Sequence, residues 1–154
     1  MEQRFNVAQL SPAGYKAMAG LEVFLANCHI EKNLLHLIKL RASQINGCAF
    51  CIDMHWKDLR AAGETEQRLY GLDAWEESPY YSPRERAALA WTEAVTRISE
   101  THVPDSVYES VKQQFNEQEL SDLTIAVAAI NAWNRIAIAA RSTPGKYQSA
   151  DHPK

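Results

Sequence analysis

Blocks of like charge and long apolar runs are both absent from this sequence. The net charge of −3 is spread over 154 residues without a basic cluster, whereas nucleic-acid-binding proteins carry a basic patch or stripe. No run approaches the roughly 18 apolar residues of a membrane-spanning helix, and the first residues lack the charged and apolar segments of a secretory signal. We therefore expect a cytoplasmic protein that binds neither nucleic acid nor membrane.

Low-complexity tracts, internal repeats and a long disordered tail are also lacking. The composition, 46% hydrophobic and 23% charged, is that of an ordinary globular protein. A chain of 154 residues can bury a core without metal or disulfide staples. We expect one domain that covers residues 1–154.

Cysteine is scarce in this chain. Three cysteines are an odd number, which argues against a secreted disulfide framework and for a catalytic or metal-binding pair with one cysteine to spare. Cys28 is the spare one, because it continues the apolar stripe of a helix predicted to begin at Pro12. We interpret it as a small buried hydrophobic residue.

Strand signals are missing as well. No segment alternates between polar and apolar residues over a sustained length, and we find neither a βαβ pattern nor a glycine-rich phosphate loop. The apolar residues instead recur at three- and four-residue steps. The sequence therefore predicts an all-α, single-domain bundle of about six to seven helices, followed by a loose tail from Ser142.

Capping signals mark the starts of two of these helices. Ser82-Pro83-Arg84-Glu85 is a capping box, and apolar residues from Ala87 to Ile98 should form the buried face of its helix. Asn116 and Glu119 cap a last helix that is apolar nearly all round from Leu120 to Ala140. Such a helix belongs in a core or a subunit interface, so a homo-oligomer is expected.

One stretch concentrates the chemistry of the chain: Asn46-Gly47-Cys48-Ala49-Phe50-Cys51-Ile52-Asp53-Met54-His55. The Asn-Gly pair is a turn signal, so a helix should begin near Cys48, and the spacing then places Cys48, Cys51 and His55 on one face. A thiol at a helix N-terminus has its pKa lowered from about 8.5 toward roughly 7 or below. The sulfur of Cys48 is then a nucleophile at neutral pH.

Three interpretations of this stretch compete on the residues alone. In dithiol redox catalysis, one thiolate attacks an oxidant such as a peroxide, becomes a sulfenic acid and is resolved by the other thiol, with His55 as the base. In a metal site, both thiolates and His55 bind zinc with a fourth ligand such as His36. In a structural module, the cysteines are only small buried residues. Haem attachment of the c type is excluded, because Ile52 and not histidine follows Cys51.

The stretch from Leu37 to His55 resembles the core of the alkylhydroperoxidase D (AhpD)-like group of the carboxymuconolactone decarboxylase superfamily. The resemblance extends to further segments: Lys57-Asp58, Ala61-Ala62-Gly63-Glu64, Ser82-Pro83-Arg84-Glu85-Arg86-Ala87-Ala88-Leu89-Ala90 and Ile130-Asn131-Ala132-Trp133-Asn134-Arg135. It implies an all-helical fold with a catalytic core at about residues 32–100, and assembly into trimers or larger rings such as hexamers.

The same resemblance implies thiol-dependent reduction of hydroperoxides in antioxidant defence. The electrons would come from a dithiol carrier, a lipoylated or thioredoxin-like protein, and no metal or prosthetic group is needed. The alternatives are a general dithiol-disulfide oxidoreductase or redox sensor, and a non-catalytic metal-binding helical module. The decarboxylase branch of the superfamily is disfavoured, because its chemistry does not require this thiol pair.

The resemblance also assigns roles to matching positions of this chain. Cys51 is the peroxidatic cysteine, Cys48 resolves it, and His55 joins a proton relay. The family relay normally includes a glutamate twelve residues before the first cysteine, and His36 stands there. By itself His36 is typical of a hydrogen-bonded core histidine, but an imidazole can also pass a proton, so we include it in the site. We expect Cys48 to be the accessible thiol and Cys51 the more buried one.

Overall fold

The computed structural model describes residues 2–149. These residues form nine α-helices and one 3-10 helix and contain no strand, so the all-α prediction is confirmed and the expected six to seven helices were too few. The two unexpected helices are α1 (Val7–Leu10) and α7 (Ile98–Thr101), each of four residues. A helix of about one turn is too short to show the periodicity on which the prediction rested.

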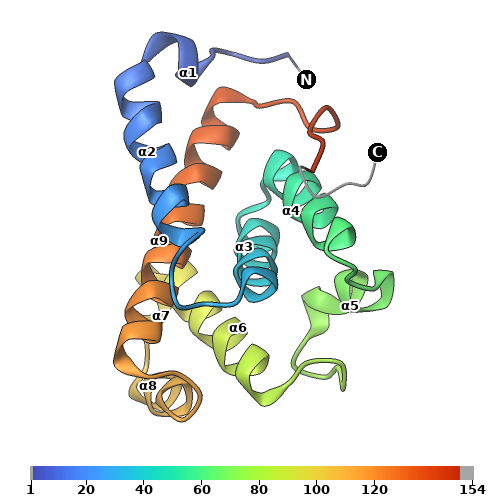
Figure 1. Cartoon of the computed structure of the whole chain (residues 1–154), viewed down its shortest axis with the longest axis vertical. Helices are drawn as coiled ribbons and strands as arrows, with labels where there is room; N and C mark the ends of the chain where they lie inside the picture. The colour runs from blue at the N-terminus through green and yellow to red at the C-terminus, as the bar shows by residue number, and fades with distance from the viewer. Residues whose placement is uncertain (1, 150–154) are drawn as a thin grey trace.

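The bundle is built around one central helix. The other elements are α2 (Pro12–Leu25), α3 (Lys32–Asn46), α4 (Ala49–Ala61), α5 (Glu66–Tyr70), the 3-10 helix η1 (Gly71–Ala74), α6 (Pro83–Thr96), α8 (Asp105–Lys112) and α9 (Glu117–Ala140). Helix α3 lies in the middle and packs against α4, α6 and α9, while α2 runs along the outer side of α9 (Figure 1). The site is therefore formed where α3, α4 and α9 meet.

Helix α3 is buried along most of its length, including two cationic side chains. Lys39 Nζ lies 2.5 Å from Glu22 of α2. Arg41 lies 2.5 Å from Asp73 and 2.8 Å from Glu93. Buried charges must be paired to be tolerated, so these contacts explain how charged residues fit into a central helix and how they tie it to its neighbours.

The predicted capping boxes are present at the starts of α6 and α9. Ser82 and Glu85 cap α6, and Asn116 and Glu119 cap α9, each through reciprocal side-chain and backbone hydrogen bonds. The prediction that Ile98 faces inward was wrong, since this residue is 56% exposed. Helix α6 ends at Thr96, and the chain turns at Arg97 before Ile98 begins α7.

Cys28 does not belong to the helix to which its spacing assigned it. Helix α2 ends at Leu25, and Cys28 lies in the turn that follows. Its side chain is nevertheless half-buried against the hydrophobic core, and it is a free thiol. The predicted packing role therefore holds in part, although the helix is shorter than expected.

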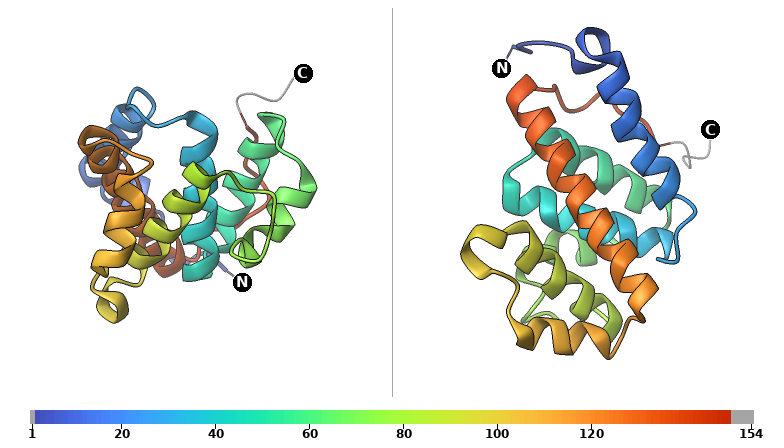
Figure 2. Two further views of the ribbon diagram at one scale, coloured as in Figure 1. Left: turned by 90° about the horizontal axis from the view of Figure 1, so that it is seen from below. Right: turned by 90° about the vertical axis from the view of Figure 1, so that its left-hand side faces the viewer.

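Helix α9 is the longest element and crosses the molecule from end to end (Figure 2). By length and composition alone it could cross a membrane, with a mean hydropathy of 1.4 in its most apolar window. Half of that window is buried, in contacts with helices that include α2, α3 and α6. The core helix of a soluble protein passes the same test, so this is weak support for a membrane span.

The segment after α9 contradicts the expectation of a loose tail, as far as residue 149. Ser142 N–H donates to Ala137 O at 2.9 Å, and Gly145 N–H donates to Asp53 Oδ2 at 3.0 Å. Lys57 Nζ donates to the carbonyls of Gly145 and Tyr147 at 3.2 and 3.1 Å. The segment is irregular, as its composition predicts, but polar side chains of α4 hold it in place. Pro153 lies outside the described residues.

Candidate active site

The turn before α4 places the two cysteines of the pair one helical turn apart. Gly47 ends α3 in the left-handed conformation, with φ of 70°. Cys48 is the N-cap of α4, and its Sγ accepts a hydrogen bond from Cys51 N–H at 3.4 Å. Cys48 and Cys51 form a disulfide, with their Cα atoms 5.4 Å apart. The predicted helix start and the predicted proximity of the thiols are therefore present.

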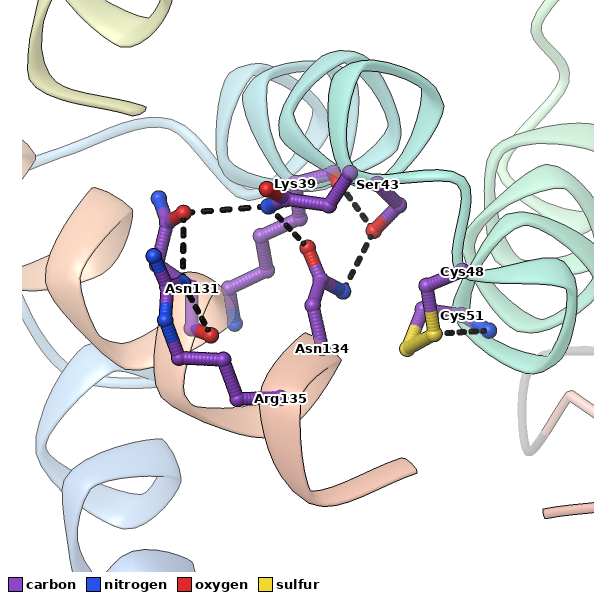
Figure 3. The surroundings of a disulfide bond; sticks show 8 residues. Lys39, Ser43, Cys48, Cys51, Asn131, Asn134 and Arg135 are labelled. Carbon is purple, nitrogen blue, oxygen red and sulfur yellow. Dashed lines mark hydrogen bonds between the residues drawn. A yellow bond between two sulfur atoms is a disulfide. The ribbon is translucent and has the colours of Figure 1, made fainter. Parts of the chain in front are cut away.

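A polar network between α3 and α9 anchors this turn (Figure 3). Asn46 Nδ2 donates to Asn131 Oδ1 at 3.0 Å and to Asn134 Oδ1 at 2.8 Å. Asn134 Nδ2 donates to Ser43 Oγ at 3.0 Å, and Ser43 donates to Lys39 O at 2.7 Å. Because Asn46 comes two residues before Cys48, the network fixes the position of Cys48 relative to α9.

Both sulfur-bearing residues are buried, but only one of them reaches a cavity. Cys48 is 1% exposed and Cys51 is 2% exposed. A cavity of about 660 Å³ is lined by Cys51, His55, His36 and mostly apolar side chains, among them Phe50, Met54, Ile130 and Trp133. Cys48 does not line it. The expectation that Cys48 is the accessible thiol was therefore wrong for this disulfide form, because Cys48 packs into the junction of α3, α4 and α9.

Two histidines and one aspartate converge on the wall of this cavity. His36 comes from α3, and His55 and Asp58 come from α4. The Nδ1 atoms of His36 and His55 are 3.4 Å apart. Asp58 Oδ2 lies 3.6 Å from His36 Nδ1 and 3.9 Å from His55 Nδ1. The structure thus brings His36 beside His55, as the family position of His36 predicted.

The site disfavours positive charge on either imidazole. Burial lowers the pKa of His55 well below its usual value, and the positive charges of Lys39 and His36 lower it further. Burial also lowers the pKa of His36; the negative charge of Asp58 opposes this, while Lys39 and Lys32 add to it. His55 Nε2 is buried and has no hydrogen-bond partner within the described residues. It is therefore a polar atom with unused bonding capacity at the centre of the site.

The ion pair of Glu22 and Lys39 also lies on the wall of the cavity. Glu22 accepts hydrogen bonds from Lys39 Nζ at 2.5 Å and from Trp133 Nε1 at 3.0 Å. The ring of Trp133 also packs edge-on against Tyr15, with 5.4 Å between the ring centroids. These contacts tie α2 to α3 and α9 and give the cavity an aromatic wall.

Sequence reasoning missed two members of the site. Asp58 follows His55 by three residues and Cys51 by seven, so it shares their helical face, and this spacing could have revealed it. Tyr147 donates from its hydroxyl to Asp58 Oδ1 at 2.7 Å, across 89 positions of sequence. No local pattern predicts such a contact.

The zinc site of two thiolates and His55, one of the alternatives, does not assemble in this form. Both sulfurs are engaged in the disulfide. The group of metal-ligating side chains that lies together in the described residues is His36, His55 and Asp58, with their ligand atoms within 4.8 Å of one another. The cysteines take no part in this group.

Fold and site together define an all-helical protein with a Cys-x-x-Cys disulfide at the start of helix α4. The sequence profile of the carboxymuconolactone decarboxylase family matches residues 11–94. YdfG of Bacillus subtilis strain 168, an uncharacterized protein, is 46% identical over 139 residues, which are 90% of this chain and 95% of YdfG. The chain therefore belongs to the carboxymuconolactone decarboxylase family, and within it to the AhpD-like proteins.

Solved structures agree with this assignment. ATU0492 of Agrobacterium tumefaciens, a protein of unknown function described as a candidate antioxidant defence protein AhpD, is 45% identical. It superposes with a TM-score of 0.92 over 95% of this chain and 100% of its own. The AhpD core structure of a peroxidase-related protein from Ralstonia eutropha JMP134 is 20% identical, with a TM-score of 0.80 over 91% of this chain and 74% of its own. At that identity, the likeness concerns the fold alone.

Proposed function

We propose that the protein is a cysteine-based hydroperoxide reductase that acts in antioxidant defence. The observation that carries the proposal is the Cys48–Cys51 disulfide at the start of α4, with Cys51 and His55 on the wall of one cavity. A disulfide between two cysteines one turn apart is the product that peroxide oxidation of such a pair leaves behind. The apolar lining of the cavity favours organic hydroperoxides over hydrogen peroxide.

The reaction proceeds in three steps on this pair. The Cys51 thiolate attacks the outer oxygen of the hydroperoxide, the O–O bond breaks, and the alkoxide leaves and is protonated to the alcohol. Cys51 is now a sulfenic acid. The Cys48 thiolate then attacks the Cys51 sulfur, the S–O bond breaks, and hydroxide leaves and is protonated to water. A dithiol donor finally reduces the disulfide by thiol–disulfide exchange and is itself oxidised to a disulfide.

The histidines provide for the proton movements of this cycle. His55 is one turn beyond Cys51 on α4, and its unpartnered Nε2 is the atom that can accept the thiol proton once the disulfide is reduced. The Nδ1 atoms of His55 and His36 are 3.4 Å apart, so a proton can be shared between the two rings. Asp58 supplies the negative charge that the family glutamate would have supplied.

The partners of this cycle follow from the family resemblance and belong to the same proposal. The electron donor is a lipoylated or thioredoxin-like protein, and the enzyme is a cytoplasmic homo-oligomer. Because Cys51 is the member of the pair that lines the cavity, the donor thiolate attacks Cys51 and releases Cys48 as the leaving thiolate. A small dithiol such as dihydrolipoamide fits this route.

The test compares Cys51→Ser with Cys48→Ser in peroxide consumption driven by a dithiol donor. We expect Cys51→Ser to abolish consumption. Cys48→Ser should stop turnover while still reacting once, leaving a sulfenic acid that a dimedone probe can trap. Cys28→Ser removes a thiol away from the pair and should behave as the parent protein. Undiminished turnover in both pair variants contradicts the proposal, and faster oxidation by protein disulfides than by hydroperoxides indicates the general dithiol oxidoreductase instead.

A further inference from the structure

We propose that His36, His55 and Asp58 form a binding site for a divalent transition metal such as Zn²⁺. The three side chains offer two imidazole Nδ1 atoms and one carboxylate oxygen, the donor set of several catalytic metal sites. Nitrogen donors select zinc and its transition-metal neighbours over Mg²⁺ and Ca²⁺, which prefer oxygen ligands alone. This site is separate from the thiols and does not depend on the proposed peroxidase activity.

The separations between the three ligand atoms suit a common metal. For metal–ligand bonds of about 2.0–2.1 Å, the edge of a coordination tetrahedron is about 3.3 Å. The distance between the two Nδ1 atoms is 3.4 Å, and Asp58 Oδ2 lies 3.6 and 3.9 Å from them. Small side-chain rotations bring these atoms onto such a tetrahedron, since all three ligands come from two helices that pack directly against each other.

The residues around His36, His55 and Asp58 provide the outer hydrogen bond and the charge balance that a metal site needs. The Tyr147 hydroxyl donates to Asp58 Oδ1 at 2.7 Å, while Oδ2 is the carboxylate oxygen that approaches the imidazoles. Such an outer hydrogen bond fixes the orientation of a ligating carboxylate. Lys39, the buried cation nearby, is paired with Glu22 at 2.5 Å, which offsets its repulsion of a bound cation.

The fourth coordination position would face the cavity. All three ligand residues line the space of about 660 Å³, so a water molecule or a small anion can complete the coordination. Three protein ligands with one open position are typical of reactive rather than structural zinc sites. Occupation of His36 and His55 by metal would also withdraw both imidazoles from proton transfer, so metal binding and thiol chemistry would exclude each other.

Isothermal titration of the oxidised full-length protein with ZnCl₂ tests the site. The Cys28→Ser background and the intact disulfide remove every thiol as a ligand. We expect one Zn²⁺ per chain, with affinity lowered at least about tenfold by His36→Gln and by Asp58→Asn, and about tenfold by Tyr147→Phe through the lost outer hydrogen bond. His29→Gln is the matched control, because His29 pairs with Asp122 elsewhere and its loss should leave the affinity unchanged.

Absorption spectroscopy with Co²⁺ provides a second readout. We expect visible ligand-field bands of a four- or five-coordinate cobalt site, without the near-ultraviolet band of thiolate coordination, and loss of these bands in the Asp58→Asn variant. Circular dichroism verifies that each variant is folded. Absence of stoichiometric uptake, or equal Zn²⁺ affinity in the parent, His36→Gln and Asp58→Asn proteins, overturns the proposal. Cobalt binding that occurs only after reduction and shows thiolate absorption also overturns the proposal, in favour of a site on the cysteines.

Discussion

At the scale of single residues, the cysteine turn depends on hydrogen bonds between amide side chains of α3 and α9. Asn134 is completely buried, accepts a hydrogen bond from Asn46 and donates one to Ser43. Its side chain therefore joins the turn before Cys48 to helix α9. Because the position is fully buried, water cannot readily replace either hydrogen bond, and losing one lowers the free energy of unfolding.

We expect Asn134→Ala to lower the free energy of unfolding by about 1–3 kcal/mol, because it removes both hydrogen bonds of a fully buried side chain and takes one partner each from Asn46 and Ser43. Urea denaturation followed by circular dichroism measures the change. Asn27→Ala provides the control: Asn27 is exposed in the turn after α2 and donates to the carbonyl of Val23, and surface changes usually stay within about 0.5 kcal/mol. Equal stability losses in both variants would contradict the importance of the buried network.

At the scale of secondary-structure elements, the site depends on the break between α3 and α4. Gly47 adopts a φ of 70°, and nothing lies within 4 Å of the position that a Cβ would take. The requirement for glycine is therefore conformational rather than steric. A Gly→Ala change here strains the backbone while leaving the packing unchanged.

Gly47→Ala should destabilise the protein by about 1 kcal/mol, the usual cost of a left-handed conformation for a residue with a Cβ. Gly14→Ala is a matched control with the opposite expected sign. Gly14 lies within α2, also has open space around it, and alanine there should stabilise the helix by about 0.5–1 kcal/mol. Thermal unfolding of both variants measures the two changes in stability. Changes of the same sign in Gly47→Ala and Gly14→Ala would contradict this account.

At the scale of the whole molecule, ion pairs link different helices to one another. Glu85 of α6 binds Arg68 of α5. Burial would raise the pKa of Glu85, but hydrogen bonds from Arg68 and from the backbone of Ser82 lower it below its ordinary value. A carboxylate with a lowered pKa in the folded state stabilises the fold above its unfolded pKa, and this stabilisation is lost as the pH falls through the folded value.

We therefore expect the free energy of unfolding to fall as the pH is lowered below about 5, and Glu85→Gln to flatten this decline. Glutamine can retain the capping box of α6, so the change mainly removes the charge. Urea unfolding at a series of pH values measures the slope. Glu117→Gln removes a carboxylate from an exposed position in the first turn of α9 and is the control. A slope unchanged by Glu85→Gln contradicts the prediction.

The outer face of α2 bears on assembly. Val23 and Phe24 are 66% and 43% exposed, although they belong to a helix whose sequence is mostly apolar. We propose that this face contributes to the homo-oligomer implied by the family resemblance. Val23→Glu together with Phe24→Glu should shift the protein toward monomer in sedimentation velocity. Tyr70→Glu, at a residue 67% exposed on α5, should not; an unchanged oligomer in the double variant contradicts this role of α2.

The sequence predicted the helical class, the capping boxes and the cysteine turn, because each depends on neighbouring residues. It also predicted that His36 would join His55, through the family position rather than through any local rule. The contact of Tyr147 with Asp58 could not be predicted, since it joins segments 89 positions apart. The prediction that Cys48 is the accessible thiol failed for the same reason, because its burial depends on how α9 packs over Cys48.

The position of Trp133 has an optical consequence. This indole lines the cavity and packs against the cluster that contains both cysteines, whereas Trp75 and Trp91 are buried in the other cluster of the core. Disulfides quench indole fluorescence at short range. Emission from Trp133 should therefore brighten when the cysteine pair is reduced, which gives a label-free signal for following the redox state of the protein in real time.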